Sequence, residues 1–224
     1  MKRTKPLFPI INEKKMFDFC NIIILGSWNT SIINPFWLTE QFPNLLKIKN
    51  KIPSAIKTEL TITPAPIFRY TFNDVTIESS NERLAFITKK NYKKQLNFIY
   101  SISSSIYDKL PHTPIIAVGH NFNYKLETEN FSLINKFFEF DKNIELFKSL
   151  TFDEQIEQQN KYTFAFQNHI LNLYLTNTNA EKGILFNYHY QIDNLQKTKK
   201  AIEEFLINYE DSKKKYSLLI KGNN

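Results

Sequence analysis

The stretch LPHTPIIAVGHNFNYKLE, residues 110–127, shows the clearest strand pattern in the chain and contains one of its four glycines. From Ile116 onward, apolar side chains occupy alternate positions, which predicts a strand with one buried face. Residues 115–118 are apolar at every position, which is typical of a strand in the centre of a sheet. We interpret Gly119 as the site of a β-bulge or of a close backbone approach, because glycine is rare in this chain.

The composition is that of a folded protein with one domain. The 224 residues are 42% hydrophobic and 15% aromatic, a content that excludes general disorder and allows a full core. No apolar run approaches the roughly 18 residues of a membrane-spanning helix. The basic N-terminus is not followed by the apolar segment of a secretion signal. We therefore expect a cytoplasmic protein without membrane contact.

Metal sites and cofactor-binding loops are not indicated. The single cysteine, Cys20, excludes an internal disulfide and a metal site built from cysteines, and we expect it to be an inert core thiol. The four histidines show neither HxH nor i, i+4 spacing. With four glycines the chain also has no glycine-rich phosphate loop. The expectation is no metal and no cofactor.

The net charge of +7 and the pI near 9.2 raise the question of a nucleic-acid partner. Only three residues are arginine, and the abundance of Lys, Asn, Ile, Phe and Tyr is typical of an AT-rich genome. Proteins that read bases or hold phosphates in bidentate geometry usually employ arginine. Nucleic acid therefore stays an alternative partner, and we favour a protein partner.

The first part of the chain predicts four strands and a helix before residue 110. An apolar run at 20–28 predicts a buried strand. Residues 29–66 contain five prolines and predict a long connection that either covers a sheet face with Phe36, Trp37 and Phe42 or faces a partner. The segments IFRYTF and VTIES, joined by Asn73-Asp74, predict a hairpin. A further strand is expected at 83–88 and an amphipathic helix at 91–110.

The second part of the chain repeats this order. A helix in one or two pieces is expected at 130–150. Alternating apolar positions then predict three strands, at 158–166, 169–176 and 183–193. The turn at Gln167-Asn168 and the loop at 177–182 are short enough to join them as hairpins. A final long helix, capped by Asp193 or Asn194, is expected to run to Tyr209 and to be followed by a lysine-rich tail.

These elements predict an α+β fold in a single domain over residues 1–224. Two halves, at about 67–127 and 155–210, would each contain a meander of three strands and then a long helix, although their residues show no repeat. The expected architecture is a large, bent antiparallel sheet that grips the two long helices. Residues 110–127 would join the halves.

Three residues are candidates for acid/base chemistry: His120, His189 and Asp193. His120 follows the apolar alternation of its strand, so a core histidine is the simpler interpretation. His189 alternates with Asn187, Gln191 and Asp193 on the polar side of its strand. That row is either a solvated sheet face or the lining of a groove, and only the groove would be catalytic.

Polar and aromatic side chains supply the candidates for binding. Asn121 follows His120 directly, and large flat side chains on a rigid surface suit both base stacking and protein anchoring. The binding candidates are Asn121, Trp37, Tyr188 and Tyr190, with Trp28 and Tyr174 as further aromatic residues of this kind.

The order of elements, with LPHTPIIAVGHNFNY after a helix and GILFNYHYQIDNL running into the last helix, resembles a sporadically distributed family of uncharacterised bacterial proteins of similar length. The resemblance covers residues 67–210. It implies no established activity and a scattered occurrence of the kind seen for mobile or phage-defence loci. No functional residue is transferred through it.

Three functional hypotheses follow. The first is a non-catalytic binding or assembly module with a protein partner, as a component of a multi-protein bacterial phage-defence system. The second is a nucleic-acid-binding protein that uses lysines and the aromatic residues of the sheet. The third is an enzyme whose site is assembled from the dispersed residues His120, His189 and Asp193.

Overall fold

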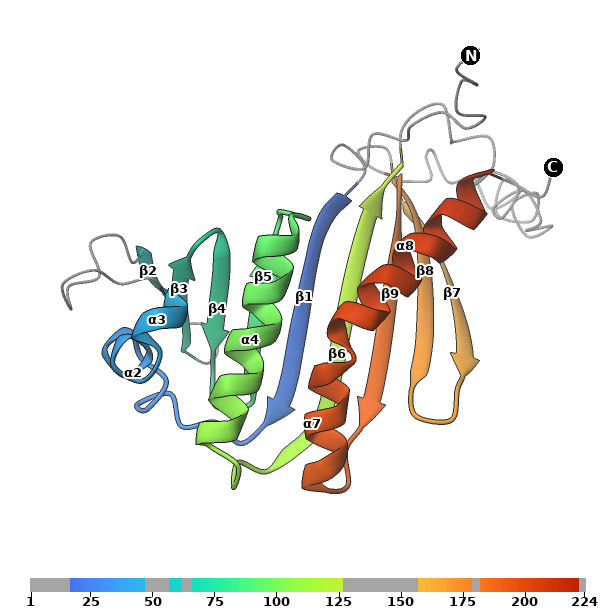
Figure 1. Cartoon of the computed structure of the whole chain (residues 1–224). Helices are drawn as coiled ribbons and strands as arrows, with labels where there is room; N and C mark the ends of the chain where they lie inside the picture. The colour runs from blue at the N-terminus through green and yellow to red at the C-terminus, as the bar shows by residue number, and fades with distance from the viewer. Residues whose placement is uncertain (1–16, 47–56, 62–65, 127–156, 179–181, 222–224) are drawn as a thin grey trace, which may run out of the picture.

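The described part of the chain is organised around one antiparallel sheet of nine strands (Figure 1). The computed structural model describes residues 17–46, 57–61, 66–126, 157–178 and 182–221. The strand order is β2-β3-β4-β5-β1-β6-β9-β8-β7. The strands are β1 (Phe17–Gly26), β2 (Lys57–Thr61), β3 (Ile67–Phe72), β4 (Val75–Ser79), β5 (Arg83–Thr88), β6 (Ile115–Lys125), β7 (Glu157–Ala165), β8 (Ile170–Thr178) and β9 (Lys182–Gln191).

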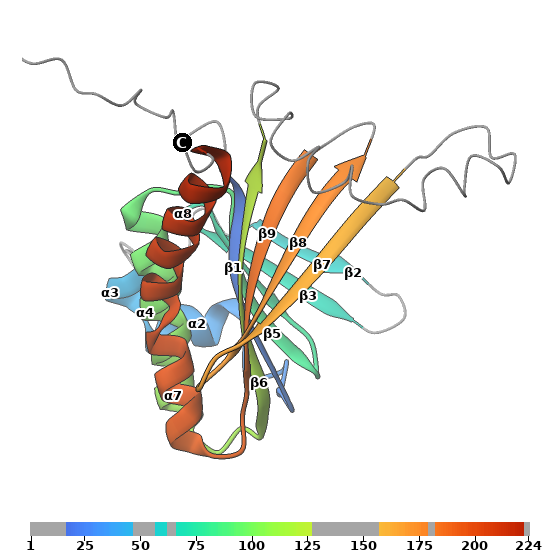
Figure 2. The same ribbon diagram turned by 90° about the vertical axis from the view of Figure 1, so that its right-hand side faces the viewer.

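The described part of the chain contains five helices, all on the same face of the sheet (Figure 2). They are α2 (Pro35–Gln41), α3 (Pro43–Leu46), α4 (Lys93–Lys109), α7 (Leu195–Glu203) and α8 (Phe205–Lys221). We call this side of the sheet the helix face and the other side the polar face. A mixed α+β fold with a large antiparallel sheet is confirmed.

Strand β6 lies between β1 and β9, so the predicted central position of residues 115–118 is confirmed. The interpretation of Gly119 was wrong. It lies in regular register opposite Ile23 on one side and His189 on the other, without a bulge. The β1–β6 ladder has two irregularities, one between Phe17 and Phe19 and the other, beside residues 115–117, between Leu25 and Gly26. There the pleat is interrupted, and the neighbouring Ile116, expected to be buried, is 58% exposed.

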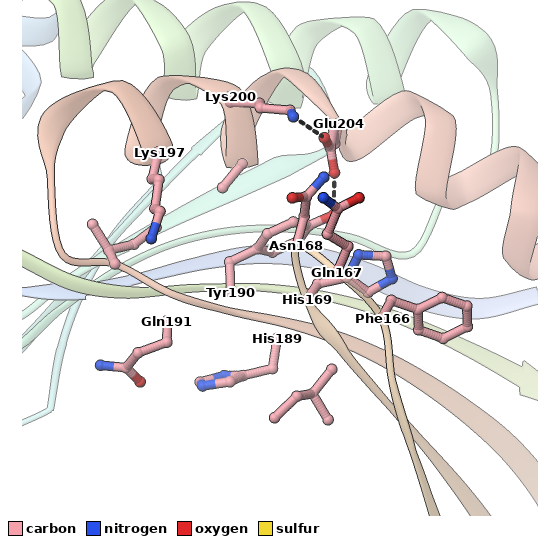
Figure 3. Close-up of a pocket in the computed structure, with 13 residues that line it drawn as sticks. Phe166, Gln167, Asn168, His169, His189, Tyr190, Gln191, Lys197, Lys200 and Glu204 are labelled. Atoms are coloured by element: carbon pink, nitrogen blue, oxygen red, sulfur yellow. Dashed lines mark hydrogen bonds and ion pairs between the residues drawn. The ribbon is translucent and has the colours of Figure 1, made fainter.

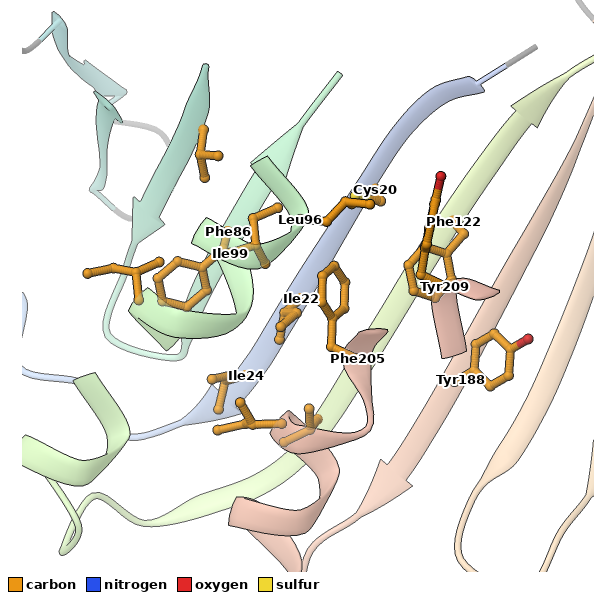
Figure 4. Close-up of a cluster of buried hydrophobic side chains, with 14 of the residues drawn as sticks. Cys20, Ile22, Ile24, Phe86, Leu96, Ile99, Phe122, Tyr188, Phe205 and Tyr209 are labelled. Carbon is orange, nitrogen blue, oxygen red and sulfur yellow. The ribbon is translucent and has the colours of Figure 1, made fainter. Parts of the chain in front are cut away.

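The core lies between the centre of the sheet and helices α4, α7 and α8 (Figure 4). Phe122 of β6 is fully buried and stacks on Phe205, which begins α8, with 5.5 Å between ring centroids. Cys20 is also fully buried, and the loss of solvation raises its thiol pKa far above the ordinary value. The expectation of an inert core thiol agrees with this environment.

Local sequence signals placed most of the described elements correctly. Asn73 and Asp74 adopt positive φ angles of 50° and 65°, as a tight hairpin turn between β3 and β4 requires. The strands expected near residues 158–166, 169–176 and 183–193 are β7, β8 and β9. Asn194 caps α7, and its side chain accepts a hydrogen bond from the backbone N–H of Lys197.

Two further expectations needed correction. Strand β2 was not predicted, because its five residues stand among prolines. The segment after Tyr209 is not a separate tail, because α8 continues to Lys221. Its buried residues recur every three or four positions, as in an amphipathic helix: Phe205, Asn208, Tyr209, Ser212, Tyr216 and Ile220. The helix expected at 130–150 lies outside the described residues.

Candidate binding pocket between the β7–β8 turn and α7

A pocket of about 620 Å³ lies where the turn between β7 and β8 approaches α7 (Figure 3). Gln167 and Asn168 form the two-residue turn, which the sequence predicted. The backbone N–H of Phe166 donates to the carbonyl of His169 across it, at 2.9 Å. The pocket is lined by Phe166, Gln167, Asn168, His169, Ile170, His189, Tyr190, Gln191, Ile192, Lys197, Lys200, Ala201 and Glu204.

Glu204 is the carboxylate of this pocket, and it lies at the junction of α7 and α8, where the helix axis changes direction (Figure 1). The hydroxyl of Tyr190 donates to its Oε2 at 2.7 Å. The Nζ of Lys200 lies 4.0 Å from its Oε1, at the limit of an ion pair. One carboxylate oxygen of Glu204 thus accepts a short hydrogen bond, and the other has only a distant ion-pair contact.

A buried chain of hydrogen bonds reaches the hydroxyl of Tyr190 from the core. Asn208 Nδ2 donates to the Tyr190 hydroxyl at 2.6 Å and lies 3.0 Å from Nδ1 of His120. Since both contacts use the same NH₂ group, His120 accepts through Nδ1 and carries its proton on Nε2. The chain therefore runs from the core histidine through Asn208 and Tyr190 to the carboxylate of Glu204.

His169 stands at the edge of the pocket among aromatic rings. Its ring stacks on Phe166, with 4.9 Å between centroids, and lies 5.2 Å from Tyr190 and 5.6 Å from Tyr188. Partial burial lowers the pKa of His169, although the carboxylates of Glu204 and Asp211 act in the opposite direction. The imidazole is therefore mainly neutral at pH 7 and contributes a flat, polarisable wall.

A second tyrosine–carboxylate pair lies next to the first. The hydroxyl of Tyr188 donates to Asp211 Oδ2 at 2.7 Å, and Asp211 also forms an ion pair with Lys215. The lysine lies over the Phe166 ring at 5.9 Å from its centroid. These contacts tie the β7–β8 turn to α8, because they join residues of β9, α8 and the turn in one cluster.

The three residues considered for acid/base chemistry do not meet. His120 is fully buried on the helix face, and burial lowers its pKa to about 3. Its sequence neighbour Gly119 pairs with His189, whose side chain points to the polar face (Figure 3). Asp193 follows β9 in an exposed ion pair with Lys197, and that hydrogen bond lowers its pKa. A catalytic site made of these three is not formed.

The binding candidates fall into different environments. Tyr188 and Tyr190 are 1% and 4% exposed on the helix face, so the expectation that their rings are accessible was wrong. Trp28 is likewise buried, whereas Trp37 packs edge-to-face against Phe42 at 5.6 Å. Phe36, expected to help cover the sheet, is 82% exposed. Tyr174, which was also proposed for stacking, lies on the polar face, and the Nζ of Lys161 lies over its ring.

Asn121 belongs to a ladder of side-chain hydrogen bonds across the polar face. Each member donates to the next at 2.7–2.9 Å across five neighbouring strands. The members, in the direction of donation, are Thr163, Asn172, Asn187, Asn121 and Asn21. The side chain of Asn121 is therefore occupied on both its amide nitrogen and its oxygen, and we assign it a role in holding the sheet.

The pocket residues His169, Gln167, Asn168, Lys200 and Glu204 were not singled out from sequence. Gln167 and Asn168 were recognised only as a turn. Glu204 had one available signal, an i, i+4 relation to Lys200 in a predicted helix, and this spacing is common on solvated helix surfaces. Within the described ranges, no group of three or more His, Cys, Asp or Glu side chains is arranged to hold a metal ion.

Comparisons with known proteins give no further identification. No protein-family model matches the chain, and no curated protein sequence matches it either. None of the helices in the described residues is both long enough and apolar enough to cross a membrane.

Proposed function

We propose that this chain is a non-catalytic binding module that recognises a protein partner at the pocket and at the exposed rings beside it. The observation that supports the proposal is a row of aromatic side chains on the helix face of β7, which we call the β7 strip: Tyr162, Phe164 and Phe166. They are 37%, 47% and 49% exposed. Contiguous exposed apolar side chains are typical of interaction surfaces.

The β7 strip and the pocket form one continuous surface. Phe166 is both the last residue of the strip and part of the pocket lining. Among the strands that the structure describes, β7 also ends the order of the sheet and pairs with β8. A partner that covers the exposed rings would therefore have the polar groups of the pocket within reach, and aromatic anchors beside specific polar contacts are the usual make-up of a protein interface.

The fold offers support of a second kind. We propose that the two halves of the chain are built alike, because β3-β4-β5 are followed by α4 and β7-β8-β9 by α7 and α8. In the first half the helix face of β3 is buried, with Tyr70 3% and Phe72 6% exposed. The corresponding face of β7 exposes Tyr162 and Phe164. This difference between the halves supports the proposal that β7 is the contact surface.

A photo-crosslinking residue in place of Phe164, introduced in the native host, tests the proposal. We expect a crosslinked product of defined mass, because the ring at 164 points to the partner. The matched control is the same residue in place of Leu218, which is 62% exposed on α8. Equal crosslinking patterns at 164 and 218, or none at 164, would refute a specific interface at β7.

As the biological setting we propose a multi-protein phage-defence system, which is what the family resemblance suggests. Deleting the gene in its host should raise the plating efficiency of at least one phage. Restoring the wild-type gene should reverse the effect, and restoring a Phe164→Ser variant should not. Plating that is unchanged over a broad phage panel would count against this setting and leave the interface itself to the crosslinking experiment.

A further inference from the structure

The charge of Glu204 is fixed in place by neutral groups. Its Oε2 accepts from Tyr190, whose hydroxyl in turn accepts from Asn208, so the phenolic proton must point to the carboxylate. His120, at the far end of this chain, is neutral at physiological pH. The buried network therefore orients the carboxylate without supplying a cation.

The lysines around the pocket compensate this charge only in part. Lys197 already pairs with Asp193, at 2.5 Å. Lys200 is 4.0 Å from Glu204, and its side chain is 61% exposed, so the pair is worth little and can be displaced. The side chain of Glu204 itself is only 20% exposed. An ordered carboxylate in a pocket favours the binding of a cation that lies closer to it than Lys200 does.

The walls of the pocket suit a flat cation. The rings of Tyr190, His169 and Phe166 form one cluster, and the amide side chains of Gln167 and Asn168 line the same pocket as Glu204 (Figure 3). A guanidinium group is planar, stacks on rings and presents five N–H donors to oxygen acceptors. A phosphate or carboxylate ligand would instead meet the negative charge of Glu204.

We infer that the pocket binds a guanidinium group, which in the complex is an arginine side chain of the protein partner, paired with Glu204 and packed against the wall that Phe166, His169 and Tyr190 form together. The identification of the arginine's source rests on the proposed function. The affinity of the pocket for guanidinium follows from the geometry of Glu204 and can be measured without the partner.

Titration of the full-length protein with N-acetyl-arginine methylamide, followed by ¹H–¹⁵N NMR, tests the inference. We expect saturable shifts of the backbone amides of Phe166, His169 and Ile170, which line the pocket. N-acetyl-citrulline methylamide has nearly the same shape without the charge, and it should bind at least about tenfold more weakly. N-acetyl-lysine methylamide should also bind more weakly, because an ammonium does not fill a planar site.

Glu204→Gln should weaken binding of the arginine compound by about tenfold or more, since it removes the charge and preserves the shape. The matched control is Glu203→Gln, which changes the exposed neighbouring carboxylate and should leave binding unchanged. If wild-type protein shows no saturable shifts, or binds arginine, citrulline and lysine compounds equally, the inference is wrong. The inference is also wrong if the Glu204→Gln and Glu203→Gln variants bind the arginine compound equally well.

These outcomes are separate from those of the crosslinking experiment. Crosslinking at residue 164 without guanidinium binding would leave the protein interface standing and remove the arginine from it. Guanidinium binding without crosslinking would show a small-molecule site and overturn the assignment to a protein partner.

Discussion

His120 shows how a residue can be placed correctly from sequence while its partners stay hidden. The alternation of β6 assigned it to the core, and it is fully buried. Its contact with Asn208, 88 positions away, arises only when α8 packs on β6. Its Nε2 has no hydrogen-bond partner within the described residues.

The burial of His120 predicts a loss of stability in mild acid. Its pKa is about 3 in the folded protein, compared with the ordinary value of 6.5. At pH 7 both states are neutral. Below pH 6.5 the unfolded chain gains a proton that the folded protein cannot accept, so the free energy of unfolding falls by about 1.4 kcal/mol per pH unit until pH 3 is approached.

Urea unfolding at pH 7.5 and 5.0 measures this contribution. Wild-type protein should lose about 2 kcal/mol more between these pH values than a His120→Gln variant. His169 also has a lowered pKa and acts in the same direction, but it is present in both proteins. An identical loss in the two proteins would show that His120 is accessible to protons in the folded state.

At the scale of elements, the joint between β1 and β6 depends on one glycine, and it is Gly26. A Cβ atom at Gly26 would lie 2.3 Å from the backbone oxygen of Pro114. This oxygen also accepts a hydrogen bond from the N–H of Ser27, so it is not free to move. A Cβ atom at Gly119 would meet only the Asn187 side chain, at an ordinary 3.7 Å.

The two glycines therefore form a matched pair of substitutions. Gly26→Ala should destabilise the protein by at least about 2 kcal/mol, because the backbone must shift to remove the overlap. Gly119→Ala should be neutral or should stabilise by up to about 1 kcal/mol, since glycine in a strand is costly. Chemical denaturation of both variants checks this, and similar values for the two would contradict the proposed close approach at Gly26.

The ladder of side-chain hydrogen bonds that runs from Thr163 to Asn21 also belongs to the scale of elements. Its five members come from β7, β8, β9, β6 and β1 and meet side by side only in the native register. A shift of any strand by one residue would turn its member to the helix face. The sequence predicted alternation in β6, β7, β8 and β9 and an apolar run in β1, each strand separately. The pairing of the amides could not be predicted, because it depends on the order of strands in the sheet.

At the scale of the whole molecule, the sheet is continuous from β2 to β7 through the central pair β1 and β6. Ile22 of β1 is fully buried at this centre and faces His120 of β6 across the ladder. Packing of this kind couples the strands β2 to β5 on one side of the central pair to β7, β8 and β9 on the other. We therefore expect the single domain predicted from sequence to unfold in one cooperative transition.

Thermal or urea unfolding followed by tryptophan fluorescence and by far-ultraviolet circular dichroism tests this expectation. The two curves should coincide, since buried Trp28 reports on one side of the sheet and circular dichroism on all of it. Ile22→Ala should shift both curves together, at a cost of about 2–5 kcal/mol. Separate transitions would show that the two halves are independent folding units.

The sequence by itself determined most of the described elements and the class of the fold, because alternation, caps and turn residues such as Asn73-Asp74 act within a few positions. It also determined that His120 belongs to the core. The tertiary structure alone decided where a site lies. The pocket combines the turn at 166–169 with Tyr190 and Glu204, and these meet because the β7–β8 hairpin lies beside β9 while α7 and α8 pack on the same face. Such convergence depends on the path of the chain in space, which leaves no periodic signal in the sequence.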